Sequence, residues 1–188
     1  MRPSRLFIAA TLALGLVSTS FAAAAEMLTI TLKTGDVVIE LADDVAPQHA
    51  ARLKALADAG EYDNVAFHRV IEGFMAQTGD VEFGDMEDGF VPQRAGTGGS
   101  SQPDLEAEFS DRPFERGTVG MARSQKPNSA NSQFFIMFAP APHLNGQYTV
   151  VGKVIKGMEL VDQIKRGSAS NNGSVNDPDR MIKVRSGG

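Results

Sequence analysis

The chain has 188 residues, of which 42% are hydrophobic and 22% are charged, and this ordinary balance excludes the disordered and collagen-like classes. Its formal net charge of -5 argues against a broad attraction to nucleic-acid phosphates or to an anionic membrane surface. Cysteine is absent, which excludes disulfides, thiolate nucleophiles and cysteine-based zinc sites. We therefore expect one compact domain with no nucleic-acid partner.

Residues 1–25 have the pattern of a secretory signal peptide. Arg2 and Arg5 precede an apolar run over 6–17, which is shorter than the roughly 20 residues of a membrane-spanning helix, and small residues follow it. Cleavage after Ala23 or after Ala25 fits equally well. Loss of the two arginines leaves 16 basic and 23 acidic residues, a net charge of -7. We expect a mature domain over 26–188 that is periplasmic or secreted and has no membrane attachment after cleavage.

The mature chain consists mainly of short β-rich runs. The first two, 27–33 and 37–41, are joined by a tight turn and predict a hairpin. A helix then begins at Pro47, with apolar residues on one face and Gly60 as its C-terminal cap. The remaining expected elements are strands at 65–71, 74–77, 117–122, 134–138, 149–155 and 181–185, and a helix over 158–166. This pattern predicts a mainly β fold, a closed eight-stranded antiparallel barrel capped by two α-helices, because closure removes exposed sheet edges.

Several common kinds of chemistry have no motif here. The nucleophile elbow of a catalytic triad is missing, and the glycine-rich stretch 96–101 lacks the Gly-Lys-Ser/Thr ending that holds phosphates. His49, His68 and His143 have no metal-ligand spacing, so structural or surface roles are expected for them. The acids in the loop 78–104 lack the spacing of an EF-hand and favour a solvated charged loop. We predict neither a metal nor a cofactor.

Two alternating patterns point to a site outside the core. Period-two alternation places Arg69 on the strand face of Val65, Phe67 and Ile71, where an arginine either reaches solvent or points at a ligand in a partly dry pocket. In 132–138 the same alternation separates Gln133, Phe135 and Met137 from Phe134, Ile136 and Phe138. One face then fills the barrel and the other carries glutamine beside phenylalanine. Met75 and Gln77 also share a face.

Five stretches, in this order, make the chain resemble the cyclophilin family of peptidyl-prolyl isomerases. They are Phe-His-Arg-Val-Ile at 67–71, Gly-Phe-Met-Ala-Gln-Thr-Gly-Asp at 73–80, Gly-Thr-Gly-Gly at 96–99, Gly-Thr-Val-Gly-Met-Ala at 117–122 and Asn-Ser-Gln-Phe-Phe-Ile at 131–136. The resemblance covers 27–185. The glycine-rich stretch alone would mean little, but the five motifs together are specific.

The resemblance implies a role for each matching position. Arg69 matches the catalytic arginine, Gln77 the group that bonds the substrate backbone, and Arg123 stands where the family has asparagine. His143 and Tyr148 replace the tryptophan and histidine of the far wall, which implies weak cyclosporin binding. The proline-ring pocket matches Phe74, Met75, Phe135 and Leu144, and the pocket rim matches Ala122 and Gln133.

The resemblance implies an enzyme that accelerates rotation about X-Pro bonds in exported proteins, without a cofactor. Its expected partners are proline-containing polypeptides, and we expect a monomer. A barrel that binds proline segments without turnover, as a chaperone or scaffold, is the alternative; retention of Arg69, Gln77 and Phe135 favours the enzyme. Transport of a small ligand inside the barrel is disfavoured, because the pocket residues lie on the face opposite Phe134, Ile136 and Phe138.

Overall fold

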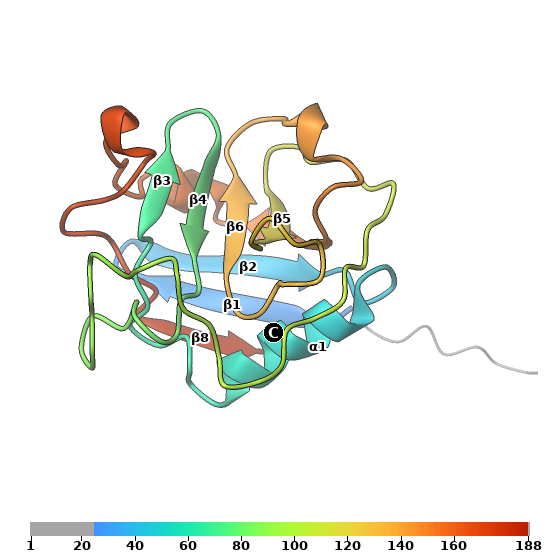
Figure 1. The fold of residues 1–188 in the computed structure, drawn as a ribbon, viewed down its shortest axis with the longest axis horizontal. Helices are drawn as coiled ribbons and strands as arrows, with labels where there is room; N and C mark the ends of the chain where they lie inside the picture. Colours follow the sequence, from blue (N-terminus) through green and yellow to red (C-terminus); the bar gives the residue numbers. More distant parts are fainter. Residues whose placement is uncertain (1–24, 188) are drawn as a thin grey trace, which may run out of the picture.

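Eight strands form one antiparallel sheet in the order β3-β4-β6-β5-β7-β2-β1-β8 (Figure 1). The computed structural model describes residues 25–187, so the predicted signal peptide lies outside the described residues except for Ala25. The elements are β1 Met27–Leu32, β2 Gly35–Leu41, α1 Pro47–Asp58, β3 Arg69–Ile71, β4 Met75–Thr78, β5 Thr118–Met121, β6 Phe134–Met137, η1 Pro142–Leu144, β7 Val150–Lys156, α2 Met158–Val161, η2 Ala169–Asn171 and β8 Lys183–Ser186. The predicted mainly β architecture with eight strands and two α-helices is confirmed.

The barrel is curled but not closed, which corrects the predicted closure. The end strands of the sheet, β3 and β8, do not pair with each other. The outer edge of β3 is instead covered by the loop 167–175, in which Gly167 N donates to Val70 O and Gly173 O accepts from Val70 N. A strand of three residues has few edge groups to satisfy, and this loop satisfies them, so strand-to-strand closure is not needed.

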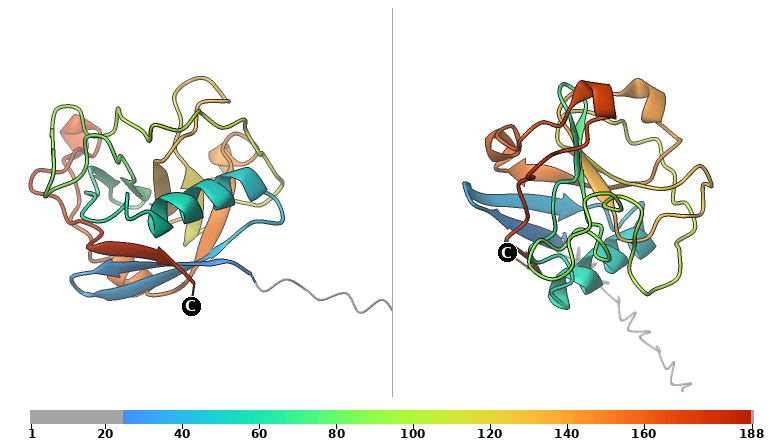
Figure 2. Two further views of the ribbon diagram at one scale, coloured as in Figure 1. Left: turned by 90° about the horizontal axis from the view of Figure 1, so that it is seen from below. Right: turned by 60° about the vertical axis from the view of Figure 1, so that its left-hand side comes forward.

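The long helix α1 covers one side of the barrel and contacts β8 and β7 (Figure 2). Pro47 is suited to the first turn, where a backbone N–H would lack a partner, and Leu53 and Leu56 are buried beneath the helix. Within 25–187 no helix has the length and apolar character required to cross a membrane.

The second helix, predicted over 158–166, is shorter than expected and ends at Val161. Two contacts of the following residues explain its end. Lys165 N donates to Asp179 Oδ2 at 2.8 Å, and the Arg166 guanidinium donates back to Asp162 O at 2.9 Å. After Val161 the chain continues in turns, with Gln163 N donating to Leu160 O and Ile164 N to Val161 O, until the distant Asp179 takes the N–H of Lys165.

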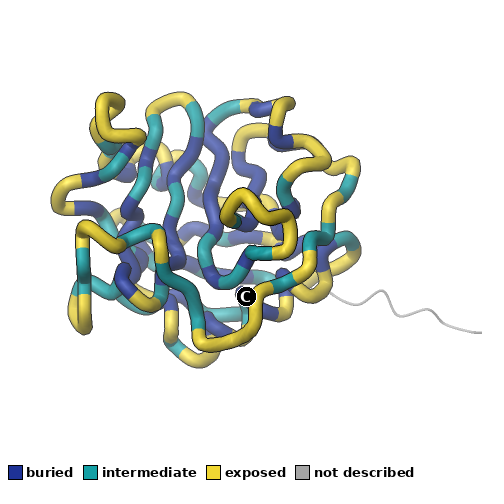
Figure 3. The backbone as a smooth tube through the Cα atoms, in the orientation of Figure 1, coloured by how far each residue is buried: buried dark blue, intermediate teal, exposed yellow. Residues whose placement is uncertain are grey.

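Apolar side chains gather in two clusters, one on each face of the sheet at β6. Phe134, Ile136 and Phe138 belong to the large cluster inside the barrel, whereas Phe135 and Met137 belong to a smaller one outside it. Figure 3 shows that β6 is buried along its length although only one face meets the barrel interior. The alternation predicted for 132–138 is confirmed.

The single strand predicted over 65–71 is wrong in its first half. Val65 and Phe67 are buried in the barrel core, and β3 begins only at Arg69. Val65 and Ala66 make isolated bridges to Asp85 and Arg180 instead of pairing with β4. Arg69 therefore does not share a face with Val65 and Phe67, and of the predicted set only Ile71 lies with it outside the core.

Candidate active site

Four neighbouring strands place one row of functional side chains across the outside of the barrel. Arg69 in β3 pairs with Gln77 in β4, Gln77 pairs with Phe135 in β6, and Phe135 pairs with Gly120 in β5. The next row joins Ile71, Met75 and Met137. Side chains directly opposite one another in antiparallel strands lie close together, so the register itself brings the guanidinium, the amide and the phenyl ring to one surface.

A cavity of about 190 Å³, which we call the small cavity, lies on this surface. It is larger than the roughly 150 Å³ that suffices to hold a benzene ring in a protein interior. The floor belongs to the outer apolar cluster, in which the Phe114 and Phe135 rings stack with centroids 5.8 Å apart. Its lining consists of Arg69, Phe74, Met75, Gln77, Ala122, Arg123, Phe135, Leu144 and Tyr148.

Arg69 is held at the edge of the small cavity by hydrogen bonds on both sides. Nη1 donates to Gln77 Oε1 at 3.2 Å, Nε donates to Asn172 O at 3.0 Å, and Nη2 donates to Asn172 Oδ1 at 3.0 Å. Nη1 also contacts Met75 Sδ at 4.0 Å, and because a guanidinium carries five N–H groups, one N–H on Nη2 has no acceptor within 25–187. Partial burial lowers the pKa of Arg69, opposed by Tyr148, and arginine remains charged under such conditions.

Asn172 reaches Arg69 from the loop that covers β3. Its backbone is left-handed, with φ 48°, a conformation that asparagine tolerates better than most residues. The next residue, Gly173, packs so closely that a Cβ there would lie 2.4 Å from Ile71 Cγ1. The loop is thus fixed against β3 both before Asn172, at Gly167, and after it, at Gly173. Asn172 therefore holds the Arg69 guanidinium in one orientation.

A chain of amide hydrogen bonds connects Arg69 to the glycine-rich loop. Gln77 Nε2 donates to Gln133 Oε1 at 3.0 Å, and Gln133 Nε2 donates to Gly98 O at 2.8 Å. The loop is anchored by the buried Asp80 carboxylate, which accepts from the backbone N–H of Gly96 at 2.7 Å and of Gly98 at 2.9 Å. Asp80 is therefore a structural anchor and not part of a solvated charged loop.

A second cavity, of about 380 Å³, adjoins the small cavity and is lined by the glycine-rich loop. The two share Gln77, Ala122 and Arg123 in their linings. The Arg123 guanidinium stacks on the Tyr148 ring at 4.3 Å from its centroid and donates through Nη2 to Gln147 O at 2.8 Å. An extended chain that occupies both cavities must cross this shared rim.

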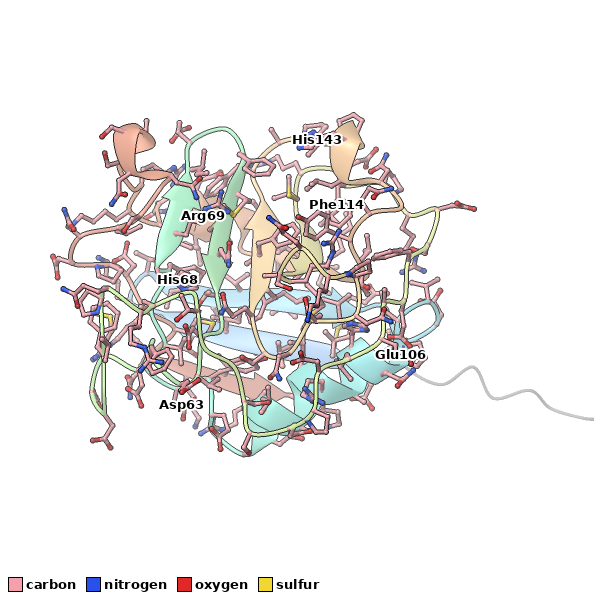
Figure 4. All side chains as sticks on the ribbon, viewed as in Figure 1. Asp63, His68, Arg69, Glu106, Phe114 and His143 are labelled. Carbon is pink, nitrogen blue, oxygen red and sulfur yellow. The ribbon has the colours of Figure 1, made fainter. Side chains whose placement is uncertain are left out.

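The structure brings the predicted site residues together, with two exceptions. Gln133 lines the second cavity rather than the small one, and His143 is exposed and lines neither. His143 stacks on the outside of Phe74, with ring centroids 5.9 Å apart, and Figure 4 shows it at the η1 end of the site, away from Arg69. The small cavity contains no residue outside the predicted set. The roles assigned to these residues remain predictions.

The three histidines lie in unrelated places. His49 is buried against Glu108, with Nδ1 2.6 Å from Oε2, while His68 is buried with neither ring nitrogen bonded. Burial lowers the pKa of His68 to about 4, opposed by the nearby Asp80 carboxylate, so the ring is neutral at pH 7. Within the part of the chain that the structure describes, no three His, Asp or Glu residues are grouped to hold a metal ion.

Sequence reasoning missed Asn172, Phe114 and Gly120 as parts of this site. Phe114 carried a weak signal, since it is a single aromatic residue in the polar stretch 111–116 and such a residue requires an apolar contact. Gly120 leaves room for the floor of the cavity, because a Cβ there would lie 2.5 Å from Phe135 Cζ. Asn172 gave no signal, since its contact with Arg69 joins residues 103 positions apart.

Sequence comparison gives one consistent result. The family described as cyclophilin type peptidyl-prolyl cis-trans isomerase/CLD matches residues 27–186. A protein of Brucella suis described as a probable peptidyl-prolyl cis-trans isomerase is 63% identical over 174 residues, which is 92% of this chain and 89% of that protein. A peptidyl-prolyl cis-trans isomerase of Arabidopsis thaliana is 40% identical over 145 residues, covering 74% of this chain and 83% of that protein.

Solved structures agree with the observed fold. A cyclophilin-type isomerase of Cryptosporidium parvum, crystallised in the presence of the dipeptide Ala-Pro, superposes with a TM-score of 0.72 at 28% identity and covers 86% of this chain and 99% of its own. A cyclophilin of Hirschia baltica superposes with a TM-score of 0.69 at 22% identity, covering 84% of this chain and 72% of its own, and supports the fold alone.

Proposed function

The chain belongs to the cyclophilin family of peptidyl-prolyl cis-trans isomerases, and we propose that it acts with Arg69 as its catalytic residue on X-Pro bonds of exported proteins while they fold. The observation that carries the catalytic part is the position of the Arg69 guanidinium, which is held at the edge of the small cavity with an N–H group of Nη2 that has no acceptor within 25–187. The exported substrates are supported by the signal-peptide pattern of residues 1–25.

The reaction requires rotation about a partial double bond and no covalent chemistry. The barrier of about 18–20 kcal/mol comes from amide resonance, and the unaided X-Pro exchange takes tens to hundreds of seconds. As the bond twists, the prolyl nitrogen loses its conjugation and becomes able to accept a hydrogen bond. A donor at that nitrogen stabilises the twisted state and not the planar one, which is the requirement for catalysis.

The geometry suits this chemistry. Phe135, Leu144 and Met75 offer an apolar surface that can hold the proline ring, and Arg69 lines the same cavity with an available N–H group on Nη2. Asn172 and Gln77 fix the guanidinium in advance, so little reorganisation accompanies the reaction. A 10⁴-fold acceleration requires about 5.4 kcal/mol, within reach of one charge-assisted bond together with restraint of the substrate.

Binding without turnover is the competing function, since the same cavity could retain proline segments as a scaffold. The arrangement of Arg69 favours catalysis, because a site for binding alone needs an apolar pocket and backbone contacts but no cation directed at the imide nitrogen. We also expect the protein to be a monomer, which size-exclusion chromatography with light scattering measures.

The decisive experiment is NMR exchange spectroscopy on an Ala-Pro peptide with the mature protein, the Arg69→Ala variant and, as control, Arg112→Gln, an exposed arginine that pairs with Asp44 and lines neither cavity. We expect exchange to accelerate with the wild type and the control. Arg69→Ala should lose most of the turnover while the peptide Kd changes little. Equal exchange with and without protein would refute the enzyme, and an equal loss of turnover and affinity in Arg69→Ala would point to binding alone.

Export is tested separately by expressing the full chain in a Gram-negative bacterium and fractionating the cells. The mature protein should be in the periplasmic or extracellular fraction, with a new N-terminus directly after Ala23 or Ala25. An intact Met1 in the cytoplasmic fraction would contradict this part of the proposal.

A further inference from the structure

The small cavity has an unusual charge balance. Its lining contains two arginines, Arg69 and Arg123, and no carboxylate, although the chain as a whole carries a net charge of -5. The ion pairs among residues 25–187 involve neither of these guanidinium groups. The site is therefore a positive region on an acidic protein, and the cause lies in these two side chains.

The isomerisation mechanism proposed above uses Arg69 and does not require Arg123. It stands on the rim shared by the small cavity and the second cavity, where an extended peptide has to pass. Stacking on Tyr148 and the bonds to Gln147 O hold its guanidinium in place, but these partners are neutral and leave its charge uncompensated. The acid that lines the second cavity, Asp104, accepts from Asn131 Nδ2 at 3.0 Å and makes no ion pair with Arg123.

We propose that Arg123 is a specificity-determining residue that selects proline segments with an acidic side chain, aspartate or glutamate, within two positions of the proline. This inference rests on the proposed function, since it concerns which substrates the same site prefers. A carboxylate on the bound peptide pairs with the Arg123 guanidinium, which has no anionic partner on the rim. The fixed guanidinium recognises it with little loss of side-chain entropy, because the stacking and the bonds to Gln147 and Ser124 have already ordered the arginine.

The test uses peptides that contain one central proline and have both termini blocked. The varied side chain is then the only possible carboxylate in each peptide. Glutamate or glutamine is placed in turn at each of the two positions on either side of the proline. For each peptide, kcat/KM is measured by NMR exchange and Kd by NMR titration, at low and at high salt. For the wild type we expect about a three- to tenfold preference for glutamate at one or two adjacent positions, and it should decrease with salt.

Three variants assign the preference to one side chain. Arg123→Gln should remove it, and Arg123→Lys, which keeps the charge but loses the ordered guanidinium, should retain part of it. Arg112→Gln changes the net charge equally at a distant surface and should leave it unchanged. Equal values for glutamate and glutamine at every position, or a preference that survives in Arg123→Gln, would overturn the inference.

The two proposals fail in different ways. If the wild type accelerates exchange of all peptides with no effect of charge, the isomerase stands and the selectivity by Arg123 does not. If no peptide exchanges faster, the proposed catalytic function fails, and the ratio of the glutamate and glutamine Kd values still decides whether Arg123 selects acidic segments. Equal Kd values would overturn the inference in that case as well.

Discussion

Replacement of Asn172 by glycine tests how far the orientation of Arg69 matters. The change removes the bond from Nη2 to Oδ1, 3.0 Å long, and keeps the backbone oxygen that accepts from Nε. Glycine adopts φ 48° without strain, whereas alanine would add a penalty of about 1–2 kcal/mol for left-handed backbone. Hydrogen bonds to charged groups contribute about 1.5–3 kcal/mol, and because this one is exposed we take about 1–2 kcal/mol.

If that energy orients the guanidinium for the twisted state, kcat should fall about five- to thirtyfold in Asn172→Gly with KM nearly unchanged. Asn172→Asp keeps an oxygen acceptor and should restore most of the activity, and Asn171→Ala is the matched control because no bond of its side chain is found within 25–187. NMR exchange kinetics and denaturant unfolding measure both effects. The reasoning is refuted if Asn172→Gly keeps its full kcat, or if Asn172→Asp is no better than Asn172→Gly.

Two further predictions concern residues around the site. Because burial lowers the pKa of His68 to about 4 while the unfolded chain has the ordinary value of about 6.5, the unfolded state binds the proton first, and the free energy of unfolding should fall between about pH 6.5 and 4 by on the order of 3 kcal/mol. Denaturant unfolding at several pH values should show this slope reduced in His68→Gln; identical slopes would exclude His68 as its source. Gly120→Ala forces a Cβ to within 2.6 Å of Phe114 and closer still to Phe135, so it should cost about 1–3 kcal/mol of stability and raise KM, as measured by unfolding and peptide titration. If Gly120→Ala has the stability and KM of the wild type, the prediction is wrong, and the Phe114 and Phe135 rings move aside at no cost.

The sequence predicted most of the fold because its strands carry a period-two signal that depends only on neighbouring residues. In β6 both faces are apolar, yet the glutamine at 133 marked which face lies outside the barrel. The stretch 65–71 is also rich in apolar residues but has a different structure, since Val65 and Ala66 pair with distant residues. A local pattern contains no information about such partners, and this is why the prediction for Val65 and Phe67 was wrong.

The site was predictable for a related reason. Except for Leu144 and Tyr148, the residues that line the small cavity lie in or next to recognisable motifs, and the register of β3, β4 and β6 brings those motifs side by side. Contacts between remote segments were not predicted. One is the bond between Asn172 and Arg69, and the other is the bond from Lys165 N to Asp179 beyond the end of α2. Closure of the barrel was wrongly predicted because the edge of β3 is covered by a loop, and no sequence pattern distinguishes that from a strand.

The loop that covers β3 is synthesised long after the strand itself. Asn172 follows Arg69 by 103 residues, so the ribosome has produced most of the domain before the guanidinium acquires its second support. Until 167–175 emerge, the outer backbone of Val70 lacks these partners, and Gln77 supports the guanidinium without Asn172. The full set of bonds that orients Arg69 therefore requires the later segment 167–175 to be packed against β3.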